Sequence, residues 1–200
     1  MKRFKEIFEE YREEIRKNGA GSLYDESFLY WVNNYVNQNR SVFNPYDFSS
    51  GKIYTFEYNT EIKKRKKYIN KRPVVFLTEK YTSGDKMLFS GVDLILIQPD
   101  IRLILLDQIT SVYKDVIEEN QKRYDEGEVL DQIPLKTDFE TFDSISNGIP
   151  FKGAYKAWDL KKVRDAYEIP FGDWAKIVYL HTRSIEGSPI DEIYKDNMSK

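Results

Sequence analysis

The stretch KIYTFEYNTEIKKRKKYINKRPVVFLTEKYTSGDKMLFSG, Lys52–Gly91, contains the pattern that decides the fold. Its first seven residues alternate between two sets of side chains, with aromatic residues at every second position, which predicts a β-strand. PVVFLTEKY predicts a second strand and TSGD predicts a turn. MLFSGVDLILIQ, Met87–Gln98, predicts a third strand that continues beyond the quoted stretch. Gly91 in this third strand indicates a bulge or a close backbone approach. The stretch therefore predicts an antiparallel β-meander.

The connection between the first two strands is strongly basic. Residues 63–72 carry seven cationic side chains, whereas the whole chain has a formal net charge of −2. Concentrated positive charge attracts phosphates or acidic protein surfaces, and an aromatic residue beside it can stack on a base or sugar. The candidate anion- or partner-binding residues are Lys63, Lys64, Arg65, Lys66, Lys67, Tyr68, Lys71 and Arg72.

The alternative interpretation of this segment is a solvated loop. We expect it to form an exposed connection in which the cations of the isolated subunit face water. Pro73 marks the boundary to the buried strand that follows. In an assembly the segment would then meet either acidic side chains of another subunit or DNA phosphates, and we favour the protein surface because the whole chain is slightly acidic.

Helical periodicity precedes the meander. Residues 2–17 and residues 25–39 each repeat apolar side chains at three- and four-residue steps, which predicts an N-terminal helical pair. Trp31 belongs to the apolar face of the second helix, so we expect it to be buried.

A long central helix is predicted from Pro99 to about Tyr124. Proline suits a first helical position, and apolar residues recur at helical spacing after it. Arg102 lies among apolar residues of this helix. We expect Arg102 either to reach solvent or to pair with a carboxylate such as Asp93 or Asp107.

The last third of the chain is less regular. TDFETFDSI predicts a short helix, NGIPFKGAYKAW mixes turn residues with aromatics, KVRDAYEIP predicts a strand, and GDWAKIVYLHT predicts a helix before a polar tail. The predicted fold class is α+β, with an N-terminal helical pair, a central antiparallel β-meander, a long central helix and a mixed C-terminal part. We expect a helical region over residues 1–43 and a core domain over residues 44–200 that ends in a short polar C-terminal tail.

Catalytic signatures are scarce in the sequence. It has no cysteine and one histidine, His181, and lacks the G-x-S-x-G and phosphate-loop motifs. Its longest apolar run lies around Val92–Ile97 and is too short to cross a bilayer. We therefore expect a soluble, non-enzymatic protein with no cofactor, no metal and no membrane partner.

Two ordered stretches resemble small virion-associated proteins of large tailed bacteriophages. Gly51–Ile109 runs from an aromatic strand through a lysine-rich linker to a Pro-Val strand, a glycine-containing strand and an arginine-bearing helix with LLD. Val163–Asn197 combines an arginine strand, a tryptophan at a helix start, an apolar helix and the ending IYKDN. The group comprises neck, tail, baseplate and DNA-end-protector-like proteins. The resemblance implies a structural or genome-end component with no catalytic residues to carry over.

Three functional hypotheses follow from these features. The first is a virion structural protein, made in the host cytoplasm, that contacts other virion structural proteins of the tail, baseplate or neck in a multi-subunit assembly. The high content of tyrosine and phenylalanine, 15 and 12 residues, favours partner contacts. The alternative is a virion protein that binds and protects DNA ends, with the cations of Lys63–Arg72 on phosphates. A third alternative is a small enzyme.

Overall fold

The computed structural model describes residues 13, 43–58, 69–111, 139–146, 148–149, 151–170, 174–178, 185–186 and 190–198. Apart from residue 13, the predicted N-terminal helical pair lies outside these ranges, and so do Trp31 and His181. The predicted central helix is described over residues 99–111, and its expected continuation to Tyr124 lies outside them.

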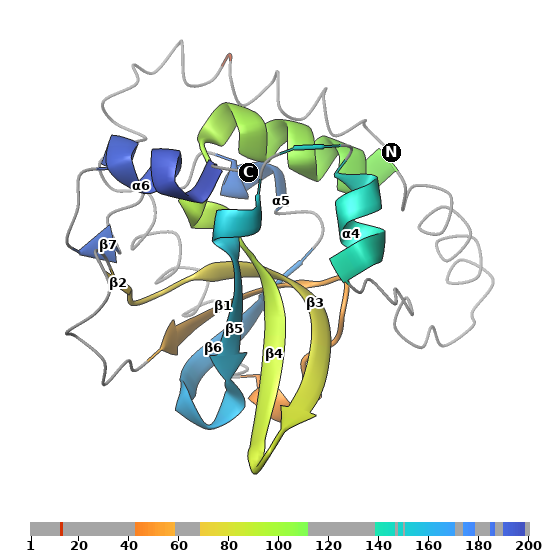
Figure 1. The fold of residues 1–200 in the computed structure, drawn as a ribbon, viewed down its shortest axis with the longest axis vertical. Coiled ribbons are helices and arrows are strands. Elements are labelled where there is room, and N and C mark those ends of the chain that lie inside the picture. Colours follow the sequence, from red (N-terminus) through yellow and green to blue (C-terminus); the bar gives the residue numbers. More distant parts are fainter. Residues whose placement is uncertain are drawn as a thin grey trace.

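The described elements combine strands with short helices, which gives a mixed α+β protein (Figure 1). The strands are β1 (Ile53–Tyr58), β2 (Ile69–Asn70), β3 (Val74–Ser83), β4 (Lys86–Asp93), β5 (Tyr155–Asp159), β6 (Val163–Ile169) and β7 (Ile185–Glu186). Besides residues 99–111, the α-helices are α4 (Phe139–Ile145), α5 (Trp174–Ile177) and α6 (Ile190–Met198). Short 3-10 helices are η1 (Pro45–Asp47), η2 (Leu94–Leu96), η3 (Lys152–Ala154) and η4 (Leu160–Lys162).

The predicted meander is confirmed and forms the centre of a five-stranded sheet in the order β5-β4-β3-β1-β6. All four strand pairs in this sheet are antiparallel. The turn of the β3–β4 hairpin is Gly84 and Asp85, within the predicted TSGD. A separate two-stranded sheet pairs β2 with β7.

The connection between β5 and β6 shows that the sheet is strongly curled. These are its two edge strands, yet only the three residues of η4 join them. In a flat sheet the edges would lie about 19 Å apart, because neighbouring strands are spaced by about 4.8 Å. Four residue steps from Asp159 to Val163 span about 14 Å at most. The two edges must therefore bend towards each other, as the strands in the lower half of Figure 1 do.

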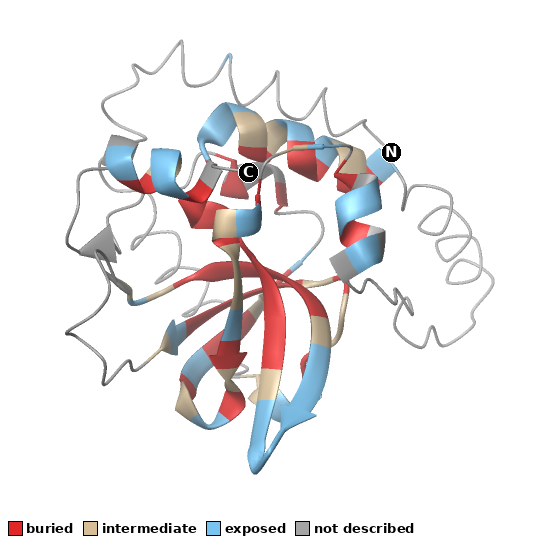
Figure 2. Cartoon of the chain, viewed as in Figure 1, coloured by how far each residue is buried: buried red, intermediate tan, exposed pale blue. Residues whose placement is uncertain are grey.

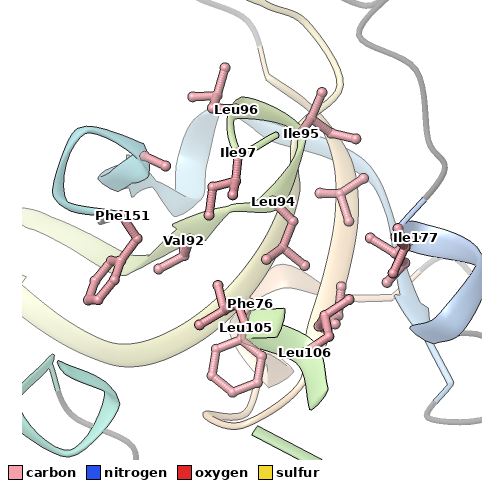
Figure 3. Close-up of a cluster of buried hydrophobic side chains, with 14 of the residues drawn as sticks. Phe76, Val92, Leu94, Ile95, Leu96, Ile97, Leu105, Leu106, Phe151 and Ile177 are labelled. Carbon is pink, nitrogen blue, oxygen red and sulfur yellow. The ribbon is translucent and has the colours of Figure 1, made fainter. Parts of the chain in front are cut away.

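Both faces of the curled sheet are buried. Along β3, Val74 and Phe76 belong to one apolar cluster, and Val75 and Leu77 belong to another, as strand alternation requires. The first cluster includes residues of 99–111, α4, α5 and α6, which lie together at the top of Figure 2. Figure 3 shows side chains of this cluster, among them Phe76, Leu105 and Ile177. The second cluster fills the interior of the curl.

Aromatic rings dominate this interior. The ring centroids of Phe48 and Tyr54 stack at 4.1 Å, and those of Phe89 and Trp158 stack at 5.4 Å. Phe56 meets both Phe89 and Trp158 edge-on. Much of the aromatic excess in the sequence therefore serves the core rather than a partner surface. Burial also raises the pKa of the Tyr54 hydroxyl, which accepts a hydrogen bond from Ser49 N at 3.0 Å.

Gly91 marks a close backbone approach, as predicted. The β3–β4 register shifts between Leu77 and Glu79, so β3 carries an extra residue opposite this point. A methyl group at Gly91 would clash with the carbonyl oxygen of Phe76 and lie 2.7 Å from Val75 Cγ1. Only glycine fits this position without displacing the neighbouring strand.

Arg102 differs from the sequence-based expectation. Its side chain is fully buried, so it does not reach solvent. Instead it donates hydrogen bonds to four backbone carbonyls: Ile177 O at 2.8 Å, Val178 O at 3.1 Å, Ile95 O at 3.4 Å and Ile97 O at 2.8 Å. Burial lowers the pKa of Arg102 to about 10. The planar guanidinium thus ties the end of α5 to the η2 turn, a role for which a fork of donors is suited.

Residues 190–198, within the segment expected as a polar C-terminal tail, form the helix α6. Ile193 and Asn197 lie one helical turn apart and are both buried. The helix packs closely on η3, because a Cβ atom at Gly153 would lie 2.5 Å from Asn197 Cα. The many charges of this segment conceal its narrow buried face.

Candidate nucleic-acid interface

The basic connection is placed by its two ends. It leaves the sheet at Tyr58, the last residue of β1, and re-enters the described structure at Ile69 of β2. Of the predicted binding residues, Lys71 and Arg72 are described, whereas Lys63–Lys67 and Tyr68 lie outside the described residues. The prediction that this segment connects β1 to the PVVFL strand is confirmed.

A buried carboxylate fixes the C-terminal end of the connection. Asn70 Nδ2 donates to Asp93 Oδ2 at 2.7 Å, and Asp93 Oδ1 accepts from the backbone nitrogens of Val74 at 3.4 Å and Ile95 at 3.3 Å. Asn70 Oδ1 in turn accepts from Arg72 N at 3.2 Å. Burial raises the pKa of Asp93, and the nearby Lys156 charge opposes that shift. Asn70 therefore anchors the C-terminal part of the connection to Asp93 at the end of β4.

Arg72 is held against the sheet rather than facing water. Its Nη2 atom lies 2.7 Å from Glu57 Oε1, and 14% of its side chain is exposed, against 55% for Glu57. Extending the β1–β3 register by two residues brings Arg72 directly opposite Glu57, and Tyr58 N donates to Lys71 O at 3.1 Å. The expectation that all cations of this segment face water is thus corrected for Arg72, because strand pairing continues beyond β3.

Arg164 lies on the other side of the same glutamate. The β1–β6 register pairs Glu57 with Arg164, and residues paired in this way present their side chains to the same face. A bulge follows in β6, where Asp165 adopts a positive φ of 43°, a conformation that aspartate tolerates better than most residues. Arg164 is exposed. Glu57 therefore stands in a cross-strand row between two arginines.

Two lysines of η4 border this row. Asp159 caps η4 by accepting a hydrogen bond from Lys161 N at 3.0 Å, and Tyr58 Oη accepts from Asp159 N at 3.2 Å. Tyr58 also pairs with Val163, so Lys161 and Lys162 lie beside the point at which the basic connection leaves β1. The sequence LKKVR, Leu160–Arg164, contains Lys161, Lys162 and Arg164. The sequence alone did not link these cations to the basic connection, because the two stretches are far apart along the chain.

We call Lys71, Arg72, Lys161, Lys162 and Arg164 the basic corner. It brings cations from two distant segments to the rim of one sheet, next to both ends of the stretch that contains Lys63–Lys67. Glu57, Asp159 and Asp165 are the acidic residues interleaved with it. Lys71, Lys161 and Arg164 are exposed, and Arg72 and Lys162 are partly exposed. Cationic side chains clustered in this way can contact several phosphates of one nucleic-acid backbone.

The described residues outside the basic corner include a second ion pair. Lys52 pairs with Glu168 at 2.8 Å, at the far end of the β1–β6 pair. Within the described ranges, His, Cys, Asp and Glu form no group of three or more that could hold a metal ion. In those same ranges no helix has the length and apolar character needed to cross a membrane.

Comparison with known proteins identifies the family. No curated protein and no solved structure matches the chain significantly. The family model described as Phage T4 terminal DNA protecting protein matches residues 2–189, which is nearly the whole chain. The match includes β1 to β7, and hence all of the basic corner. The chain therefore belongs to the Phage T4 terminal DNA protecting protein family.

Proposed function

We propose that this protein is a virion protein that binds the ends of linear phage DNA and shields them from enzymes that attack DNA ends. The observation that supports the proposal is the coincidence of the basic corner with the highly basic stretch of residues 63–67, in a chain of the DNA-protecting family. Family membership favours this alternative over contacts in the tail, baseplate or neck.

The chemistry of the interface is phosphate neutralisation. Each Lys or Arg that replaces a counterion on B-DNA adds about 0.9 to the slope of log affinity against log salt. The basic corner and residues 63–67 together supply ten cations, so a slope of several units is expected even if half of them make contact. Such contacts position a protein on DNA without reading its sequence.

In this proposal the protein shields DNA ends by occupying them, and not by catalysing a reaction. A protein seated on the terminal phosphates covers the strand ends that an exonuclease must engage. Because the whole chain has a net charge of −2, we expect DNA contact where positive charge is concentrated, at the basic corner and residues 63–67.

The test is a binding titration of the full-length protein with a linear DNA duplex across a salt series. Affinity should fall steeply between about 50 mM and about 200 mM salt. The triple variant Lys161→Glu, Lys162→Glu, Arg164→Glu should bind far more weakly, and so should the variant with Lys63, Lys64, Lys66 and Lys67 changed to Glu. The matched control is Lys86→Glu, Lys152→Glu, Lys195→Glu, which makes the same charge change at exposed lysines of β4, η3 and α6.

Preference for ends requires a competition experiment. The competitor is one circular DNA, added intact or cut into progressively more fragments at constant mass. A protein that binds ends is displaced better as the number of fragments rises. Equal competition by the intact circle and its fragments would show a general duplex binder, and equal binding by the two triple variants would rule out the basic corner.

A further inference from the structure

The row Arg72–Glu57–Arg164 has the arrangement of an occupied anion site. Glu57 is the residue of β1 that stands between the two arginines, through the extended β3 register on one side and the β6 register on the other. Directly opposed residues have Cβ atoms about 5 Å apart, close enough for all three side chains to meet at one anion. The carboxylate is more exposed than the guanidinium that it binds, at 55% against 14%.

The Arg72 fork is only half used. Nη2 donates to Glu57 Oε1, but Nη1 is shielded from solvent and has no hydrogen-bond acceptor within the described part of the chain. A buried guanidinium nitrogen without an acceptor is unfavourable, and arginine forks are usually satisfied by two oxygens of a carboxylate or phosphate. Glu57 thus leaves one donor of the Arg72 guanidinium unsatisfied.

We infer that the Glu57 carboxylate occupies the position of a DNA backbone phosphate and is displaced when DNA binds. This inference rests on the proposed function and assigns a particular phosphate site within it. A phosphate between the arginines accepts from Arg72 Nη2 and from Arg164, whereas the carboxylate is bound through a single oxygen in the Arg72 contact. The displaced Glu57 side chain moves into water, which its exposure allows.

Glu57 then acts as a built-in competitor that weakens DNA binding. Its removal frees Arg72 and takes a negative charge away from the phosphate. An exposed ion pair contributes up to about 1 kcal/mol, so Glu57→Gln should tighten binding about fivefold at low salt. The salt slope should become steeper by about 0.9, because one more cation is available to release its counterion.

The experiment compares duplex binding by the wild type, Glu57→Gln, Arg72→Gln and the double variant over the same salt series. The gain from Glu57→Gln should shrink in the Arg72→Gln background, because the two residues act on one phosphate. The matched control is Glu168→Gln, which removes the same charge from an ion pair of similar length, with Lys52, at the other end of the β1–β6 pair. Thermal unfolding of each variant verifies that the fold is retained.

The possible outcomes distinguish a failure of this inference from a failure of the proposed function. If the wild type binds DNA but Glu57→Gln binds no tighter than Glu168→Gln, the inference is wrong and the proposed function stands. The inference that a phosphate displaces Glu57 from Arg72 is also wrong if Glu57→Gln raises the affinity for DNA equally in the wild-type and Arg72→Gln backgrounds. If the wild type binds no duplex even at about 50 mM salt, where phosphate contacts are strong, both fail.

Discussion

Replacing Arg102 with methionine should destabilise the protein strongly, although methionine has nearly the same length and is apolar. The two shortest contacts of the guanidinium, to Ile177 O and Ile97 O, are both 2.8 Å long and lie in the core. Each buried carbonyl that loses its donor costs about 1–3 kcal/mol, which gives about 2–6 kcal/mol for the pair.

Part of this cost is offset because the variant no longer buries a charge. A net loss of about 2–4 kcal/mol remains, a large fraction of the 5–15 kcal/mol typical of folded domains. Urea unfolding followed by the fluorescence of the buried Trp158 and Trp174 measures it directly. Ile104→Met is the matched control, since Ile104 lies on the same helix with 47% of its surface exposed and should change stability little. An Arg102→Met variant as stable as this control would refute the argument that the hydrogen bonds from Arg102 to these carbonyls stabilise the fold.

Three further predictions concern the sheet and the buried Asp93, which holds the end of the basic connection. Gly91→Ala should lower the melting temperature markedly, because the new methyl meets the Phe76 carbonyl; an unchanged melting temperature would contradict the close approach. Trp158→Ala should cost about 3–5 kcal/mol in urea unfolding, since the ring stacks on Phe89 inside the curl; a loss below about 1 kcal/mol would place it outside the core. Burial raises the native pKa of Asp93 above its ordinary 3.8, so the protonated group favours folding at low pH, and this stability is lost as the pH rises through the native pKa. The unfolding free energy of the wild type minus that of Asp93→Asn should therefore fall with pH across this window, and a pH-independent difference would contradict it.

The local pattern predicted the meander well because its signals are short-range. Alternation in residues 52–58, the apolar start of residues 74–77 and the TSGD turn each depend on neighbouring residues alone. The end of β4 was predicted too late. The strand stops at Asp93, whose carboxylate caps η2, whereas the apolar run continues to Ile97.

The positions that sequence could not predict depend on contacts between distant segments. β6 pairs with β1 rather than with its chain neighbour β5, so Arg164 reaches Glu57 from more than a hundred residues away. The role of Arg102 was equally hidden, since its acceptors are backbone carbonyls that carry no sequence signature. The basic connection was found from charge alone, but the lysines of η4 became part of the site only through the curl of the sheet.

The most direct test of the proposed function is exonuclease digestion of linear duplex DNA in the presence of the full-length protein. An exonuclease that enters at duplex ends should be slowed in proportion to the occupied ends, and an endonuclease cutting the same DNA internally should not be slowed. The triple variant Lys161→Glu, Lys162→Glu, Arg164→Glu should give no protection, while the matched Lys86→Glu, Lys152→Glu, Lys195→Glu control should protect like the wild type. Digestion of linear DNA at an unchanged rate, with protein in excess over ends at low salt, would contradict the account.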